Sequence, residues 1–209
     1  MSLIQSLKWR YATKKFDTSK SISADDMQVI LEAIQLTATS YGLQAYKVLN
    51  IANKELRQQM QAASWGQAQV VEASDVLVFC AYIEITSDMV DTYVERKATI
   101  QSIPPKNLEG YSDFMKSKIQ EKSAEELIEW NARQIYIALG NLLAICGELE
   151  IDACPMEGFE PEKYDKLLGL KEKGLTAVVV CPIGYRSAED FTQHSPKVRR
   201  PLEELFETI

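Results

Sequence analysis

The sequence predicts a single domain, over residues 1–209, in which helices and strands pack around one hydrophobic core. Three observations lead to this fold class. The length of 209 residues is close to that of one domain. The composition, 46% apolar and 25% charged, is that of an ordinary globular protein. Segments with helical periodicity are interspersed with short apolar runs of strand length, and no repeat or linker divides the chain.

The first half of the chain predicts one helix and two strands. Ser23 is followed by two aspartates and then by apolar residues at helical spacing, which predicts an N-capped helix that runs to about Ala38. The segment 46–52 alternates imperfectly and is strand-like, and 76–82 is an apolar run short enough for a buried strand. We expect both strands in one sheet.

The middle of the chain is expected to contain an irregular segment followed by a long helix. Residues 91–122 are polar and contain two prolines and a glycine, so we expect a mobile excursion with some helix in it, as functional lids often are. From Ser123 a broad apolar surface at helical spacing predicts a central helix that ends near Gly147.

The last part of the chain predicts a short helix, a strand and a tail. Pro161 is expected at the start of the helix, since proline is favoured in the first helical turn. The run 176–183 is strongly strand-like. The polar tail, 185–209, is expected to return over the surface.

Charge and composition disfavour several classes of function. A net charge of -7 and a pI of about 4.9 oppose binding to nucleic acid or to an anionic membrane. No stretch reaches the ~20 apolar residues that span a bilayer, and residues 1–7 lack the core of a signal peptide, so we expect a cytoplasmic protein. His194, the only histidine, is expected at the surface, and the four cysteines, which form no C-x-x-C pair, are expected to be buried and reduced. We expect no metal site, and the absence of Gly-rich phosphate loops disfavours Rossmann and P-loop sites.

Three segments carry residues suited to binding a ligand. In W-R-Y-A-T-K-K-F-D at 9–17, Arg10 offers a planar fork that matches phosphate, and Lys14 a compact charge for a carbonyl or ring nitrogen. P-K-V-R-R-P at 196–201 is a basic cluster held between two prolines. P-M-E-G-F at 155–159 has a glycine that lets the backbone approach a ligand. Taken singly, a solvated basic turn, a solvated tail and a simple turn are the more common interpretations.

The order of motifs along the chain is more specific than any one of them. R-x-x-T-K-x-F-D is followed by a Thr/Ser loop with a Gln after the first helix, A-S-x-V-x-V-F, W-x-x-x-Q-x-Y-x-x-x-G-N, P-x-E-G-F, G-L-K-E-K-G and P-K-x-R-x-P. This set resembles the nitroreductase family, specifically its oxygen-insensitive NAD(P)H nitroreductases and flavin reductases, from about Leu7 to Pro201. Residues 91–122 match least well.

The resemblance implies an α+β fold, with a mixed, mainly antiparallel central sheet surrounded by helices, and an intertwined homodimer with two FMN molecules at its interface. It also implies that Arg10, Lys197 and Arg199 bind the FMN phosphate, and that the segment 155–158 places a backbone N–H near flavin N5. Hydride transfer between stacked rings needs no side-chain nucleophile, so no catalytic residue is expected. The implied cofactor contacts are Arg10, Tyr11, Ala12, Lys14, Ala38, Thr39, Ser40, Gly42, Gln67, Gln69, Pro155, Met156, Glu157, Gly158, Lys197 and Arg199.

The loop 38–42, which the resemblance places against the FMN of the partner subunit, departs from the family. Gly42 stands where Asn is usual, and Gln44-Ala45-Tyr46 stands where Gln-Pro-Trp is usual. The expected substrate contacts are Ser40, Tyr41 and Phe114, with Tyr111 as the alternative aromatic gate, and Arg96 is an expected outer contact to the phosphate.

The flavin edge is a second departure. Gly66 and Gln69 occupy positions where the family usually has Asn and Lys against the flavin pyrimidine, and Gln67 is a neighbour that could substitute. Glutamine can satisfy an imide edge, but the missing lysine removes a positive charge near N1 and O2. We therefore predict a lower flavin reduction potential than in family members with that lysine. An equal or higher potential in a spectroelectrochemical titration would contradict this.

The function that the resemblance implies is NAD(P)H-dependent reduction of nitroaromatics, quinones or related small acceptors through FMN, in a ping-pong cycle on one flavin face. Two alternatives stay open on the sequence. One is a non-catalytic or sensory flavin-binding protein of the same fold, and the other is a structural homologue without flavin.

Overall fold

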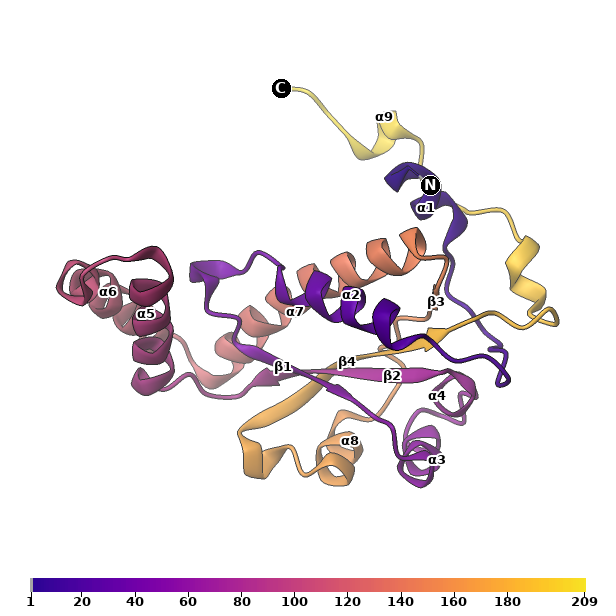
Figure 1. Cartoon of the computed structure of the whole chain (residues 1–209), viewed down its shortest axis with the longest axis horizontal. Coiled ribbons are helices and arrows are strands. Elements are labelled where there is room, and N and C mark those ends of the chain that lie inside the picture. Colours follow the sequence, from indigo (N-terminus) through magenta and orange to yellow (C-terminus); the bar gives the residue numbers. More distant parts are fainter. Residues whose placement is uncertain (1) are drawn as a thin grey trace.

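The computed structural model describes residues 2–209, and its centre is a four-stranded sheet in the order β1-β2-β4-β3 (Figure 1). All neighbouring strands are antiparallel, and the single parallel bridge among the described residues joins Ala12 to Ala153. The three expected strands are confirmed, with ends shifted by one or two residues. The strands are β1 (Tyr46–Asn50), β2 (Asp75–Tyr82), β3 (Asp152–Ala153) and β4 (Leu175–Gly184).

Helices cover both faces of this sheet (Figure 1). Strand β2 is therefore buried on both sides, which explains its continuously apolar sequence. Leu77 and Phe79 point to one face and Val76 and Val78 to the other, and all four are fully buried. Helices α2 (Ala24–Gln35) and α7 (Ala124–Glu148) pack on the face of Leu77 and Phe79. Helices α3 (Lys54–Ala62), α4 (Gln69–Glu72) and α8 (Pro161–Leu168) pack on the opposite face.

The helix starts that the sequence predicted are confirmed. The Ser23 side chain accepts a hydrogen bond from the Asp26 N–H, and Ser123 forms a capping box with Glu126 at the start of α7. Pro161 occupies the first turn of α8. Helix α2 ends at Gln35, three residues before the expected Ala38, because the chain turns there into the loop that leads to η1 (Ser40–Gly42).

The expectation of an irregular excursion at 91–122 is wrong. This segment lies almost wholly in helices α5 (Ser87–Gln101) and α6 (Glu109–Gln120), which are joined through η2 (Pro105–Leu108). Val90, Val94, Met115 and Ile119 are buried in a core of their own, which the two helices share with the start of α7. Their spacing of four residues carried the helical signal, and the two prolines mark the connection between helices rather than a loop throughout.

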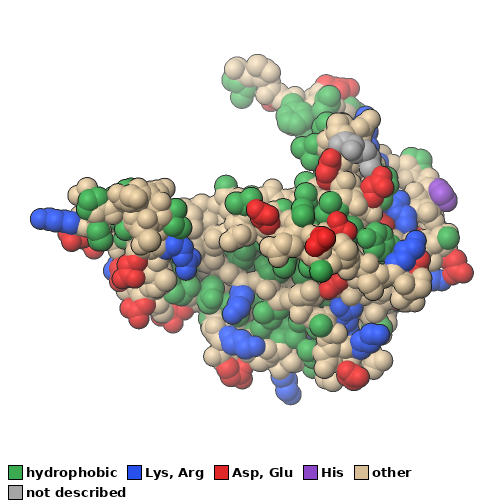
Figure 2. All heavy atoms as spheres, viewed as in Figure 1, with side chains coloured by type: hydrophobic (Ala, Val, Ile, Leu, Met, Phe, Trp, Pro, Cys, Tyr) green, Lys and Arg blue, Asp and Glu red, His purple; other side chains and the backbone are tan. Residues whose placement is uncertain are grey.

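The two ends of the chain meet at one edge of the molecule. Backbone hydrogen bonds from Asp17 N to Tyr185 O (2.8 Å) and from Ser187 N to Lys15 O (2.9 Å) tie the tail to the N-terminal segment. The remaining short elements are α1 (Leu3–Trp9), η3 (Lys171–Lys173), η4 (Phe191–His194) and α9 (Leu202–Leu205). The tail returns over the surface as expected as far as Lys197, which contacts Arg10, but its end stands clear of the body and is exposed (Figures 1 and 2).

The expectations that the cysteines are buried and that His194 lies at the surface are confirmed. All four cysteines are buried and form no disulfide, and His194 is exposed. No group of histidine, cysteine or acidic side chains within residues 2–209 is arranged to hold a metal ion. In the same part of the chain, none of the helices combines the length and the apolar character needed to cross a membrane.

Candidate functional site

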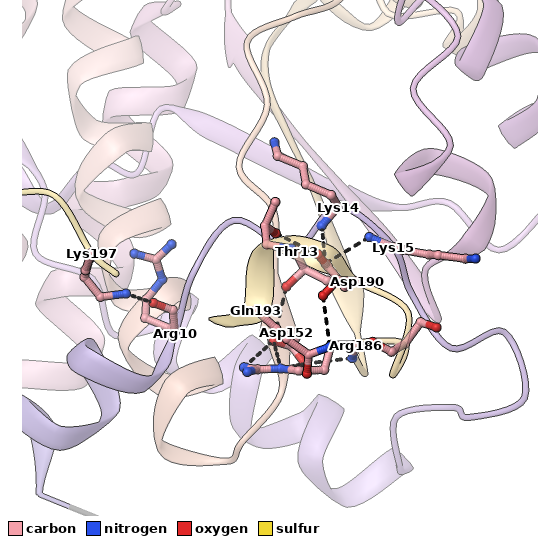
Figure 3. Close-up of polar contacts among 11 residues, drawn as sticks. Arg10, Thr13, Lys14, Lys15, Asp152, Arg186, Asp190, Gln193 and Lys197 are labelled. Carbon is pink, nitrogen blue, oxygen red and sulfur yellow. Dashed lines mark hydrogen bonds and ion pairs between the residues drawn. The ribbon is translucent and has the colours of Figure 1, made fainter. Parts of the chain in front are cut away.

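Three cations from the two ends of the chain converge on one place. Arg10 caps the C-terminal end of α1, and the Lys197 ammonium donates a hydrogen bond to the Arg10 carbonyl oxygen (Figure 3). Burial and the charge of Arg199 lower the pKa of Arg10, and burial together with the charges of Arg10 and Arg199 lowers the pKa of Lys197. The fold therefore holds like charges close enough to repel one another.

This cation cluster, Arg10, Lys197 and Arg199, has no anion of its own. Among residues 2–209, no carboxylate forms an ion pair with any of the three. The Arg10 Nε is buried and has no acceptor. A buried donor without a partner costs free energy, and a phosphate group would supply both the acceptor oxygens and the missing negative charge. The cluster thus fits the phosphate end of a nucleotide cofactor.

A network of buried carboxylates holds the N-terminal segment beside this cluster (Figure 3). Asp190 accepts from the backbone N–H groups of Lys14 (2.7 Å) and Lys15 (3.1 Å). Asp152 accepts from Thr13 Oγ1 (3.1 Å) and pairs with Arg186 at 2.7 Å. Both carboxylates are nearly fully buried. The backbone of 13–15 is thereby fixed, while the Lys14 side chain stays exposed and free to reach a ligand.

The neighbours of Arg10 in the segment 9–12 are held by Arg186. Its guanidinium lies 4.1 Å from the ring centre of Trp9 and 4.5 Å from that of Tyr11. The Tyr11 hydroxyl is buried without a partner, and burial raises the pKa of Tyr11 to about 12, although the charge of Arg186 opposes the shift. Ala12 is half-buried and bridges to Ala153. Tyr11 therefore offers a second unused polar atom near the cation cluster.

The segment 155–158 follows β3 and presents free backbone donors. The N–H groups of Glu157 and Gly158 donate no hydrogen bond within residues 2–209. The Gly158 carbonyl accepts from Gln67 Nε2 (2.7 Å). Met156 is different, because its N–H and C=O both pair with Val180 and its side chain is buried in the core, so its geometry does not support the expected cofactor contact.

The flavin-edge residues of the sequence analysis lie around this segment. Gln67 donates to the Gly158 carbonyl, whereas Gln69 is buried and lies beside the thiol of Cys154. Two consecutive residues here have positive φ angles: +55° at the exposed Trp65 and +78° at Gly66. Trp65 was not expected at the site, yet its ring lies against Gly158.

Gly158 has no room for a side chain, and this gives a test of the segment. A Cβ there would lie 3.0 Å from both Gln67 Nε2 and Trp65 Cζ3. We expect Gly158→Ala to displace Gln67 from the Gly158 carbonyl and to weaken FMN binding about fivefold, as the loss of about 1 kcal/mol implies. Fluorescence titration of the apoprotein with FMN measures this. Gly110→Ala, where nothing lies within 4 Å of the added Cβ, is the control, and equal affinity in the two variants would contradict the prediction.

A second group of expected contacts lies in the loop 38–42. Gln134 of α7 accepts from the Ser40 N–H (2.8 Å), and Gln44 N donates to Thr39 Oγ1 (3.2 Å). Gly42 has a φ of +77°, and a Cβ there would meet the Tyr93 hydroxyl at 2.9 Å. Glycine in place of the usual asparagine thus lets Tyr93 close over the loop. Ala38 is exposed.

The expected substrate residues form an aromatic cluster beside this loop. Tyr41, held at a φ of +60°, has its ring centre 5.9 Å from that of Trp130, 6.3 Å from Phe114 and 6.5 Å from Tyr111. The Tyr111 hydroxyl donates to the Tyr41 carbonyl, and Phe114 is half exposed. Both gate candidates are therefore present, with Tyr111 fixed and Phe114 freer to move.

Within one chain the two groups of residues lie on different sides of α7. Ser40 contacts Gln134 and Glu157 contacts Tyr136, two positions that lie about 200° apart around α7, so a helix about 10 Å wide separates them. The cation cluster is farther still, because Ser6 of α1 binds Glu148 at the end of α7, about 20 Å along the helix from Gln134. Arg96 lies on α5 at the end of the molecule opposite α1 (Figure 1), so within one chain it does not approach the cluster.

Comparison with known proteins agrees with this architecture. The sequence profile of the Nitroreductase family matches residues 7–185. The chain is 29% identical to the oxygen-insensitive NAD(P)H nitroreductase of Salmonella typhimurium, covering 97% of each chain. It is 31% identical to the major NAD(P)H-flavin oxidoreductase of Aliivibrio fischeri, covering 98% of this chain and 97% of the relative. A chain from Exiguobacterium sibiricum, crystallised in complex with FMN, superposes with a TM-score of 0.84 at 19% identity, covering 100% of this chain and 98% of the other.

Proposed function

The chain belongs to the nitroreductase family, and from this premise we propose that it is an FMN-dependent oxidoreductase that takes hydride from NAD(P)H and reduces small acceptors such as nitroaromatics or quinones. The observation that carries the proposal is the cation cluster, whose three positive charges have no carboxylate partner among residues 2–209. Burial of the Arg10 Nε without an acceptor costs free energy, which a bound anion would recover.

Different residues would bind different parts of the cofactor. Arg10, Lys197 and Arg199 would hold the phosphate through charge-assisted hydrogen bonds, and Lys14 would reach toward the ring. FMN, when bound, supplies the hydride acceptor at N5. The free N–H groups of Glu157 and Gly158 would face the polar edge at N5 and stabilise the charge that changes there.

We further propose a homodimer in which each FMN is held by both chains. The separation of the loop 38–42 from the segment 155–158 by the width of α7 supports this, because a second chain can bring its loop to the cofactor. The exposed apolar side chains of α1 and α9, which include Leu3, Ile4 and Leu205, offer surface to such a partner. We place the enzyme in the cytoplasm, where buried, reduced cysteines are usual.

Anaerobic mixing of the FMN-loaded protein with NADH or NADPH tests the function. Bleaching of the flavin within seconds, followed by reoxidation on adding a quinone or nitroaromatic, is the expected result. A flavin that stays oxidised would instead indicate the non-catalytic binding protein, and a preparation that takes up no FMN would exclude both.

A further inference from the structure

The segment 155–160 is anchored on both sides of its two free donors. Met156 pairs with Val180 before them, and the Glu160 N–H donates to Ala63 O (2.9 Å) after them. Between these anchors the Phe159 N–H donates to Glu157 O (2.9 Å), which folds the backbone into a tight turn. The direction of the N–H groups of Glu157 and Gly158 therefore depends on what holds the top of this turn.

Two side chains hold that turn from opposite directions. Gln67 donates to the Gly158 carbonyl, and the hydroxyl of Tyr136 donates to the carboxylate of Glu157. Tyr136 belongs to α7, whose neighbouring residues Ile135, Ala138 and Leu139 are buried against the sheet. A rigid, packed helix thus supplies the partner for an exposed glutamate.

The hydrogen bond between Tyr136 and Glu157 contributes little to the stability of the fold. Tyr136 is 41% exposed and Glu157 is exposed, and hydrogen bonds between solvated groups contribute little because water replaces them. The tyrosine stays a donor at all ordinary pH values, since burial and then the hydrogen bond and charge of Glu157 raise the pKa of Tyr136 to about 12.

We propose that Tyr136 is a positioning residue that fixes Glu157 and thereby aims the free N–H groups of Glu157 and Gly158 at the flavin ring. The proposal rests on the proposed function, because it needs FMN at this segment. Tyr136 acts through Glu157 and does not itself take part in hydride transfer. An oriented donor contributes to a reaction only within narrow limits of distance and angle, so a small movement of the turn is enough to slow the step.

The test is a double-mutant cycle of Tyr136→Phe and Glu157→Ala. We expect each variant to lower the rate constant for flavin reduction by NADH about tenfold. The dissociation constant of NADH should not change, because the variants alter the orientation of the N–H groups and not the binding of the nicotinamide. The double variant should be no slower than either single one. Glu157→Gln, which keeps an acceptor for the tyrosine, should react nearly as fast as the wild type.

Two measurements on the apoprotein separate positioning from folding. The affinity for FMN should fall about threefold in Tyr136→Phe, through loss of order in the turn, while the Tm of the apoprotein stays the same. Tyr82→Phe is the matched control, because the Tyr82 hydroxyl has no hydrogen-bond partner within residues 2–209. It should leave FMN affinity and reduction rate as in the wild type.

The outcomes are distinct. If the wild type binds FMN and is reduced by NADH but Tyr136→Phe matches it in both rate and affinity, the positioning role is wrong and the proposed function stands. Strictly additive losses in the double variant would also overturn it, since the two residues would then act independently. If the wild type neither binds FMN nor bleaches, the proposed function itself fails.

Discussion

Arg10→Met is expected to weaken FMN binding by a factor of about 10 to 100 without lowering the Tm of the apoprotein. A charge-assisted hydrogen bond contributes about 1.5–3 kcal/mol, which sets the size of the loss. The apoprotein should become more stable, because the lowered pKa of Arg10 means that the folded state disfavours the charge on its guanidinium. Affinity and stability should therefore move in opposite directions.

Isothermal titration of the apoprotein with FMN and a thermal melt without FMN measure the two quantities. Lys197→Met should weaken FMN binding as well, because it removes a second positive charge beside Arg10. Arg200→Met is the control, because Arg200 lies in the same exposed tail outside the cation cluster. Similar losses of affinity in Arg200→Met and Arg10→Met would mean that net charge, and not the cluster, attracts the phosphate.

Asp190→Asn is expected to lower the free energy of unfolding by about 3 kcal/mol at pH 7. Its carboxylate accepts from the N–H groups of Lys14, Lys15 and Thr192 and from the Thr192 hydroxyl (2.6 Å), and an amide turns one acceptor into a donor. Buried donors left without an acceptor cost about 1–3 kcal/mol each. The loss should also reduce FMN affinity, because the backbone beside Arg10 is released.

The same carboxylate predicts a dependence on pH. Burial raises the pKa of Asp190, but the hydrogen bonds from Thr192, Lys14 and Lys15 outweigh it and bring the pKa to about 2. A carboxyl with a depressed pKa stabilises the fold above its unfolded pKa of about 4, and this stabilisation, about 2 kcal/mol, disappears as the pH falls toward 2. Urea unfolding should show the difference between wild type and Asp190→Asn shrinking over that range. The exposed Asp113→Asn is the control, and a difference independent of pH would contradict the assignment.

The sequence predicted those parts of the fold whose signals are local. Ser23 and Ser123 cap helices through contacts three residues away, and the apolar run of β2 needs no knowledge of its neighbours. The error at 91–122 came from giving two prolines more weight than the buried positions four residues apart on either side of them. Proline ends a helix but does not exclude one immediately before or after it.

The site was predictable only in part, for a related reason. The resemblance located the cation cluster, and the structure brings Arg10 and Lys197, 187 residues apart, into contact. Asp190 and Asp152 were missed, although Asp152 stands directly between Ile151 and Ala153, and a carboxylate flanked by apolar residues is a candidate for a buried, partnered one. Gln134 was missed because its partner Ser40 lies 94 residues away, and no spacing rule connects them.

The position of α7 between the loop 38–42 and the segment 155–158 of one chain predicts how defective alleles would combine. In the proposed dimer, a defect in the cation cluster damages the chain's own cofactor site, whereas a defect in the loop damages its partner's. When one chain carries the first defect and the other the second, both lesions fall on the same site and the remaining site is intact. Two inactive alleles of this gene would therefore complement each other when expressed together.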